Sequence, residues 1–272
     1  MVYIYALILG IVQAITEFLP ISSSGHLVIL HNILNFNLEQ NVAFDLALHL
    51  GTACALVIYF REELKKYFWA VIKIFIPGKS IVQSDLKVAL NIFYATIPAG
   101  CAGVIFESII EKYVRSTEII IITLLLGAIL FFIAEKFFEK TRDFSGLSGW
   151  KSVYIGIAQA LALIPGVSRS GITIVAGMSL KLKRSEAARF SFLMGIPIIF
   201  GAALFKIVKI NFDYLSSQDI AFFLIGFSSS FVLGFFVVKH LLKYLQNHSL
   251  KIFAWYRICL AMFLAIGMFL AR

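Results

Sequence analysis

Charge is scarce in this chain. Asp, Glu, Lys and Arg together make up 14% of the 272 residues, 60% of the residues are hydrophobic, and the mean hydropathy is +0.92. Soluble domains have about a quarter charged residues and about half apolar ones. The composition therefore excludes an ordinary soluble domain and predicts an all-α integral membrane protein with several spans. The sequence also lacks a long polar segment, so residues 1–272 are predicted to form one membrane domain.

Cysteine and early basic residues are scarce as well. The three cysteines lie far apart in apolar runs and form no CxxC pair, so they are expected to be small packed side chains. No Lys or Arg precedes Arg61, which excludes the basic start of a secretory signal peptide. The net charge of +9 does not indicate nucleic acid as a partner, because the basic residues gather in short segments between apolar runs. Cytoplasmic loops of membrane proteins have this pattern.

Long apolar segments are what the chain has in abundance. Each of six segments is about long enough to cross roughly 30 Å of hydrocarbon as a helix. Residues 62–76 are also apolar, but five charged residues interrupt them, and they are predicted to form an interfacial amphipathic helix. The six predicted transmembrane helices are residues 44–60, 88–106, 118–134, 190–208, 220–238 and 252–271.

Two regions, residues 1–38 and 150–180, have a polar break between two apolar arms. The second arm of the first region, residues 27–38, would rise only about 18 Å as a helix, which is too little to cross. A re-entrant helix–loop–helix hairpin is therefore predicted for each region. Irregular backbone at membrane depth is tolerated only where it is buried in protein or lines a wet cavity. Both breaks are expected to line a cavity.

The same two regions resemble each other. The stretch GIVQAITEFLPISSSGH (10–26) aligns without gaps on GIAQALALIPGVSRSGI (156–172). The offset of 146 also brings Phe44 onto Phe190, at the start of the next span. This predicts an internal duplication, with repeat one at about 1–140 and repeat two at about 150–272. Three spans per repeat is an odd number, so the two repeats are predicted to have inverted topologies.

The Lys and Arg residues orient the chain. If the N-terminus lies outside, the segments inside hold 17 of the 24 Lys and Arg residues, and the segments outside hold five. Cytoplasmic segments carry the excess of Lys and Arg. Both termini are therefore predicted to lie outside.

The first break holds residue types that end one helix and begin another. Leu19 precedes Pro20, so the first helix should end there. Ser22, Ser23 or Ser24 can cap the next helix. The start of that helix offers free N–H groups and the positive end of a dipole, which suits an anion and phosphate in particular.

The second break, residues 164–173, repeats this pattern and adds Arg169, whose forked guanidinium suits phosphate oxygens. Two inverted hairpins would bring both breaks together near the membrane midplane, which predicts a phosphate site there. Its predicted residues are Ser22, Ser24, Gly25, Ser168, Arg169, Ser170, Gly171 and Thr173.

Glu17 is costly inside a membrane and needs a partner or a role. Gln13 lies one helical turn before it on the same face. Carboxylate and carboxamide oxygens suit Mg²⁺ or Ca²⁺, so Gln13 and Glu17 are predicted metal ligands. The alternative is that Glu17 pairs with Arg169, and both can hold in the resting state. Asp45 is a weaker candidate, as a supporting residue behind the site.

Ser23 and His26 are candidate catalytic residues. His26 follows the serines within one turn and could take the proton of Ser23 or protonate a leaving oxygen. Two other polar residues are predicted to play no part: His49 is expected to be a packed or interfacial histidine, and Arg257 is expected to extend its charged end to the interface.

The two repeats differ in chemistry, which favours catalysis around one centre over transport. A transporter or flippase for a phosphorylated lipid is the alternative, because inverted repeats with broken helices occur in many secondary transporters. Such a protein would move its substrate without releasing phosphate. The diverged positions Glu17, Ser23 and His26 align with Leu163, Arg169 and Ile172.

Two motifs resemble those of the undecaprenyl-diphosphate phosphatase family, also known as the bacitracin-resistance protein family. QAITEFLPISSSGH (13–26) resembles the family's [EQ]-x-x-x-E segment with the Ser-rich His motif that follows it. PGVSRSGIT (165–173) resembles the family's PGxSRSxxT motif. The likeness covers the whole chain in length, span pattern and duplication.

The resemblance implies removal of the terminal phosphate from undecaprenyl diphosphate, which recycles the C55 lipid carrier of cell-wall synthesis. It also implies dependence on Mg²⁺ or Ca²⁺ and an active site open to the outer face of the bacterial plasma (inner) membrane. The implied partners are the polyprenyl diphosphate and the bilayer, and a homo-oligomer is compatible with the sequence. Gln13 stands where the family also has Glu, which leaves one carboxylate fewer for metal.

By position, the resemblance implies that Gln13 and Glu17 bind metal or assist catalysis. It leaves Ser23 and His26 as competing nucleophiles. It implies that the phosphate is bound by Arg169 together with Ser168, Ser170 and Thr173.

Overall fold

The computed structural model describes residues 2–34, 41–113, 116–208 and 216–270. Within these ranges the chain forms eleven α-helices, two short 3-10 turns and no β-strand, apart from one isolated bridge between Arg142 and Leu182. The predicted all-α class is confirmed. The helices are α1 Val2–Phe18, α2 Ser23–Leu34, α3 Asn41–Tyr59, α4 Arg61–Ile72, α5 Gln83–Tyr113, α6 Thr117–Phe137, α7 Gly149–Leu161, α8 Arg169–Ser179, α9 Arg184–Ile207, α10 Ser217–Asn247 and α11 Lys251–Leu270.

Five of the described helices are long and apolar enough to cross a membrane, namely α5, α6, α9, α10 and α11. They coincide with five of the six predicted spans. The sixth prediction, residues 44–60, coincides with α3, which passes the same test only together with α4. The 80° bend between these two helices turns α4 away from the bundle.

Helix α4 covers most of the predicted amphipathic segment 62–76. Lys65 and Lys66 are exposed on it, as are the large apolar side chains of Phe68 and Trp69. The predicted amphipathic helix is confirmed as a helix. The expectation for the cysteines is wrong in part: Cys101 and Cys259 are exposed on the outside of the bundle, and Cys54 is half-buried.

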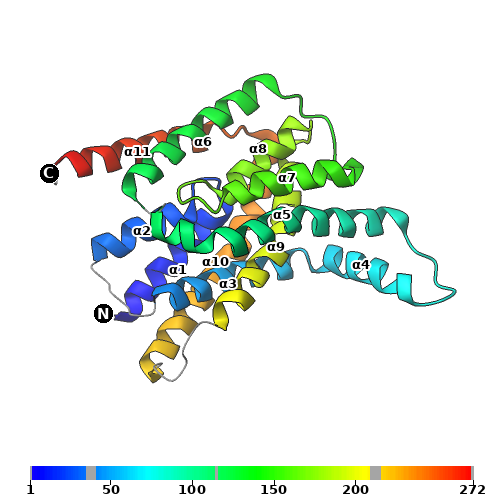
Figure 1. Ribbon diagram of the computed structural model, residues 1–272, viewed down its shortest axis with the longest axis horizontal. Coiled ribbons are helices and arrows are strands. Elements are labelled where there is room, and N and C mark those ends of the chain that lie inside the picture. Colours follow the sequence, from blue (N-terminus) through cyan, green and yellow to red (C-terminus); the bar gives the residue numbers. More distant parts are fainter. Residues whose placement is uncertain (1, 35–40, 114–115, 209–215, 271–272) are drawn as a thin grey trace.

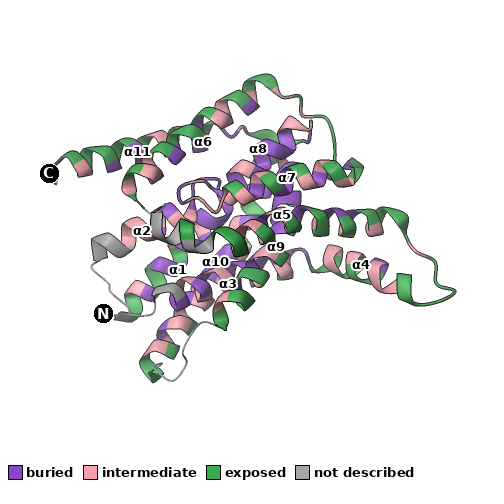
Figure 2. Cartoon of the chain, in the orientation of Figure 1, coloured by how far each residue is buried: buried purple, intermediate pink, exposed green. Residues whose placement is uncertain are grey.

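The helices of the two halves are interleaved. Helix α10 packs against α1 and α3, α5 packs against α7 and α9, and α6 packs against α11. Figure 1 shows α1 beginning and α11 ending at the left edge of the molecule, while α4 projects from the right. Buried residues gather at the centre, where α1, α8, α9 and α10 meet, and the outer helices are largely exposed (Figure 2). The exposed apolar surface is what a lipid-facing bundle requires.

The two polar breaks separate α1 from α2 and α7 from α8. Helix α1 ends at Phe18, as Pro20 predicts, and α2 begins at Ser23. Ser22 has a φ of 76° and its hydroxyl oxygen accepts the N–H of Gly25 at 3.3 Å. The arms after the breaks have 12 and 11 described residues, which is about 18 and 16 Å of helix and too short to cross.

Candidate active site

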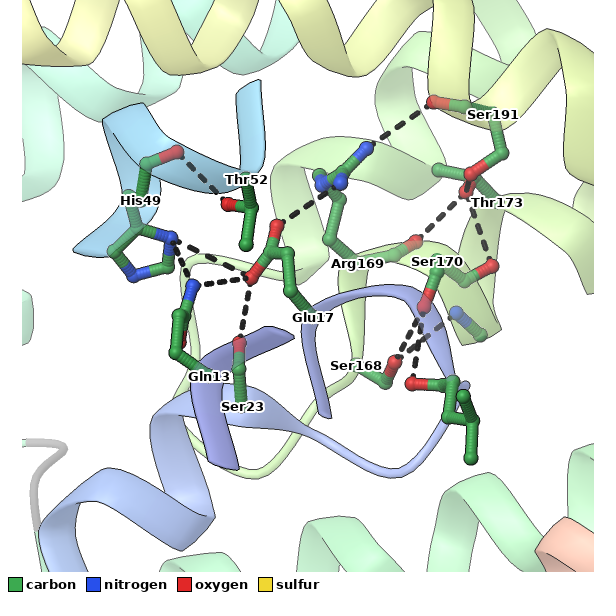
Figure 3. A network of polar contacts seen from close by, with 12 residues as sticks. Gln13, Glu17, Ser23, His49, Thr52, Ser168, Arg169, Ser170, Thr173 and Ser191 are labelled. Carbon is green, nitrogen blue, oxygen red and sulfur yellow. Dashed lines mark hydrogen bonds and ion pairs between the residues drawn. The ribbon is translucent and has the colours of Figure 1, made fainter. Parts of the chain in front are cut away.

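Glu17 is the centre of a buried polar network that joins the two halves (Figure 3). Its Oε1 accepts a hydrogen bond from Arg169 Nη2 at 3.0 Å. Its Oε2 accepts from Ser23 Oγ at 2.8 Å and from Gln13 Nε2 at 3.2 Å. The last turn of α1, the start of α2 and the start of α8 therefore meet at one carboxylate.

The ion pair between Glu17 and Arg169 is the alternative that the sequence left open, and it is confirmed. The exposed fractions of the two side chains are 5% and 14%. An ionised group in an apolar bundle is tolerated when it is paired and hydrogen-bonded. The pair therefore explains how both charges persist at this depth.

His49 is packed into the bundle, as predicted, but it also belongs to the network, which the sequence did not predict. Its Nδ1 lies 2.9 Å from Gln13 Nε2 and 3.4 Å from Glu17 Oε2. The hydroxyl of Thr52 donates to the His49 carbonyl at 2.8 Å. Asp45 lies one turn before His49 on α3 and is half-buried. That i, i+4 spacing of two polar residues in an apolar helix is the signal that could have found His49.

Arg169 is held from its other side by α9. Its Nη1 donates to the carbonyl oxygen of Ser191 at 3.1 Å. Thr173 Oγ1 lies 2.7 Å from Ser191 Oγ and donates to the Arg169 carbonyl at 2.7 Å. Thr173 is buried and its hydroxyl contacts protein, so its role in binding phosphate stays a prediction. These hydrogen bonds join α8 to α9 next to Arg169.

The serines of the breaks cap helices. Ser168 Oγ accepts the N–H of Gly171 at 3.1 Å and lies 3.1 Å from Ser170 Oγ. In the first break Ser22 Oγ caps α2 and lies 3.3 Å from Ser24 Oγ. Caps of this kind satisfy N–H groups that a helix start leaves free. Of the predicted site residues in the two breaks, those that are only half-buried are Ser23, Ser24, His26 and Arg169.

His26 faces away from Ser23. Its Nδ1 lies 2.7 Å from the Ser22 carbonyl oxygen and its Nε2 lies 2.8 Å from the Tyr256 hydroxyl. A carbonyl oxygen can only accept, so Nδ1 carries the hydrogen and Nε2 accepts from Tyr256. Ser23 donates to Glu17 instead. The sequence gives no signal for Tyr256, which lies in a span far along the chain.

Arg257 is fully buried, so the prediction that it extends to the interface is wrong. Its guanidinium donates to the carbonyl oxygens of Pro20 at 3.3 Å and Gly166 at 3.0 Å, one in each break. It also donates to Leu124 at 3.1 Å and Thr123 at 2.9 Å on α6. The physical reason for burial is that irregular backbone leaves carbonyl groups unpaired, and Arg257 satisfies them.

Among the described residues, two buried atoms near Glu17 lack a hydrogen-bond partner: Gln13 Oε1 and Arg169 Nε. Gln13 Nε2 is the amide atom that faces Glu17 Oε2. A free amide oxygen suits a hard cation, and a guanidinium N–H suits a phosphate oxygen. The described residues contain no group of three or more His, Cys, Asp or Glu that could hold a metal ion. Gln13 and Glu17 alone fit Mg²⁺, which commonly takes one or two protein oxygens and completes its shell with water and substrate phosphates.

Known proteins resemble this chain over nearly its whole length. The family model described as Bacitracin resistance protein BacA matches residues 6–263. Proteins called undecaprenyl-diphosphatase are similar in Thermodesulfovibrio yellowstonii (43% identity, 97% of this chain and 95% of the relative) and in Geotalea daltonii (41%, 94% and 96%). The protein of the same name in Rubrobacter xylanophilus is 38% identical over 96% of each chain.

Proposed function

Because this chain belongs to the bacitracin resistance protein family, we propose that it is an undecaprenyl-diphosphatase. It removes the terminal phosphate of undecaprenyl diphosphate and so returns the lipid carrier to cell-wall synthesis. The observation that carries the proposal is the meeting of Ser23 and Arg169 at the carboxylate of Glu17. Those three side chains supply a nucleophile, a base and a phosphate-binding cation.

Arg169 binds the diphosphate. Its Nη1 and Nη2 are oriented by Ser191 and Glu17, and its Nε is buried without a partner. Each terminal nitrogen of a guanidinium carries a second hydrogen, so the group can hold phosphate oxygens without leaving Glu17. The N-terminal ends of α2 and α8 add positive potential at the same place.

Ser23 is the better supported nucleophile. Its hydroxyl donates to Glu17 Oε2 at 2.8 Å, so the carboxylate can take its proton as the Oγ–P bond forms. The bond from the terminal phosphorus to the bridging oxygen breaks, and undecaprenyl phosphate leaves. Water then hydrolyses the phosphoserine. His26 is the competing nucleophile, but its Nδ1 donates to Ser22 and its Nε2 accepts from Tyr256.

Gln13 and Glu17 would hold Mg²⁺ or Ca²⁺ through their side-chain oxygens. The bound ion would neutralise charge on the phosphates. Gln13 Oε1 supports this role because it is buried without a partner.

The two halves are proposed to be inverted repeats with re-entrant hairpins α1–α2 and α7–α8. The helices of the two halves correspond in order: α1, α3, α5 and α6 in the first half match α7, α9, α10 and α11 in the second. The contact of α1 with α10 then corresponds to the contact of α7 with α5. The aligned glycines Gly10 and Gly156 lie at these two contacts. A Cβ on Gly10 would lie 2.7 Å from the Gly226 carbonyl oxygen, and one on Gly156 would lie 2.9 Å from the Ala95 carbonyl carbon.

The proposed orientation in the inner membrane has both termini and the active site toward the outer side. The excess of Lys and Arg in the segments assigned to the inside supports it. It is tested by cysteine labelling in a variant without native cysteines. An impermeant thiol reagent added to intact cells should label a cysteine at position 3 and leave one at position 79 unlabelled, and the opposite pattern would reverse the orientation.

The activity is tested by phosphate release from undecaprenyl diphosphate by the purified protein in detergent, with Mg²⁺ or with a chelator. Metal-dependent release that is lost in Ser23→Ala is the expected result. Labelled substrate and rapid acid quenching separate the two nucleophiles, because phosphoserine survives acid and phosphohistidine does not. No release from folded protein would refute the proposal and direct attention to lipid flipping in vesicles.

A further inference from the structure

The guanidinium of Arg169 lies directly on Gly195 of α9. A Cβ added at Gly195 would lie 2.7 Å from Arg169 Cζ and 3.1 Å from Nη2, and still closer to Nη1. Such distances are shorter than carbon and nitrogen atoms tolerate without bonding. The guanidinium therefore occupies the space that the side chain of any other residue at position 195 would need.

The guanidinium cannot move aside without losing its partners. Nη1 donates to Ser191, which lies one helical turn before Gly195, and Nη2 donates to Glu17. The group is thus held at two nitrogens and lies against α9 at a residue that has no side chain. Displacing it would break the contact with α9 or the link to the other half of the protein.

The equivalent place in the first half is filled differently. The offset of 146 aligns Gly195 with His49 and Arg169 with Ser23. In the first half His49 on α3 and Ser23 on α2 both approach Glu17 Oε2, at 3.4 and 2.8 Å. In the second half Arg169 on α8 lies on Gly195 of α9. The larger side chain is thus on the later helix in the first half and on the earlier helix in the second.

We propose that Gly195 is a positioning residue for the phosphate-binding arginine. The space left by its missing side chain is where the guanidinium lies when Arg169 donates to Ser191 and Glu17. A methyl group at this position displaces the guanidinium while leaving α9 helical. This proposal rests on the phosphatase function for its kinetic test, but not for its test by stability.

The kinetic test compares Gly195→Ala with Gly201→Ala. Gly201 lies in the same helix, and a Cβ added there meets nothing within 4 Å. We expect Gly195→Ala to lower kcat/KM for undecaprenyl diphosphate at least tenfold, with part of the loss in KM, because Arg169 binds the phosphate. Gly201→Ala should stay within twofold of the unchanged protein. Activity of Gly195→Ala within twofold of the unchanged protein overturns the proposal.

The stability test asks whether the effect passes through Arg169. Gly195→Ala should lower Tm in the otherwise unchanged protein, because it breaks the contacts of a buried ion pair. In an Arg169→Ala background the same change should raise Tm, because the space is vacated and alanine favours a helix over glycine. Arg169→Met provides the same test with more of the volume retained. An equal loss of Tm in all three backgrounds would assign Gly195 to helix packing alone and refute the proposal.

The two tests fail separately. If neither the unchanged protein nor any variant releases phosphate, the proposed function is wrong. A Tm that Gly195→Ala lowers in the unchanged protein and raises in the Arg169→Ala background would still establish that Gly195 makes room for Arg169. If phosphate is released normally by Gly195→Ala, the function stands and the positioning role does not.

Discussion

The breaks after α1 and after α7 can be compared position by position. Ser22 caps α2 through the N–H of Gly25, and Ser168 caps α8 through the N–H of Gly171. Each capping hydroxyl also lies close to that of the serine two residues later, at 3.3 Å in the first break and 3.1 Å in the second. The capping bonds are alike although the backbone is not, because φ is 76° at Ser22 and −64° at Ser168.

The aligned side chains that differ include those to which we assign the reaction. Glu17 in the first half aligns with an apolar leucine, and Ser23 aligns with Arg169. The two halves then meet in one hydrogen-bonded network. The comparison agrees with the predicted duplication: like capping bonds position the two helix starts, and the proposed reaction draws different residues from the two aligned breaks.

Breaking the pair across the two halves should have the largest effect. Glu17→Ala and Arg169→Ala each leave a buried charge without its partner, which typically costs about 3–5 kcal/mol. Each also removes a group proposed to touch the substrate, so phosphate release should fall at least about a thousandfold. The measurement is turnover in detergent, with thermal unfolding to establish that each variant is folded. A folded Glu17→Ala with a tenth of the normal rate would contradict the division of roles.

Arg257 tests what the two breaks have in common. The offset of 146 aligns Pro20 with Gly166, and Arg257 donates to both of their carbonyl oxygens. Arg257→Met should leave these groups unpaired at about 1–3 kcal/mol each and lower Tm substantially. Arg257→Lys should recover part of the loss, because it keeps the charge but not the fork. Lys251→Met, on the same helix and exposed, is the control, and an equal loss of Tm there would contradict this role.

Sequence reasoning was strong on local features and weak on contacts between distant segments. The break at Pro20 and a serine cap after each break follow from local rules, and the structure confirms them, with Ser22 as the cap in the first break and Ser168 in the second. Tyr256 and Arg257 lie more than 200 residues from the first break. An arginine in the last span looks the same in sequence whether it reaches lipid or folds inward, and only packing decides which.

His49 occupies the position that aligns with Gly195 in the second half, so its replacement tests a side chain that only the first half has. His49→Ala removes the ring nitrogen that lies 2.9 Å from Gln13 Nε2 and 3.4 Å from Glu17 Oε2. A hydrogen bond typically contributes about 1 kcal/mol, so the rate should fall roughly five- to tenfold. The control is Thr52→Val, because the Thr52 hydroxyl bonds only to its own helix at the His49 carbonyl. An unchanged rate in His49→Ala would mean that the network works without its histidine.

The caps should show the smallest effect and the closest equality between the halves. Ser22→Ala and Ser168→Ala each leave one helix-start N–H without its acceptor, and loss of such a cap typically costs about 1 kcal/mol. Because both serines are buried and accept the same bond, the two variants should lose similar stability in thermal or denaturant unfolding. Neither hydroxyl lies on the proposed path of the phosphoryl group, so turnover should fall far less than in Ser23→Ala. A cap that costs several times more in one half than in the other would mean that the two caps are not equivalent, since each variant removes the same capping bond and the same contact with the serine two residues later.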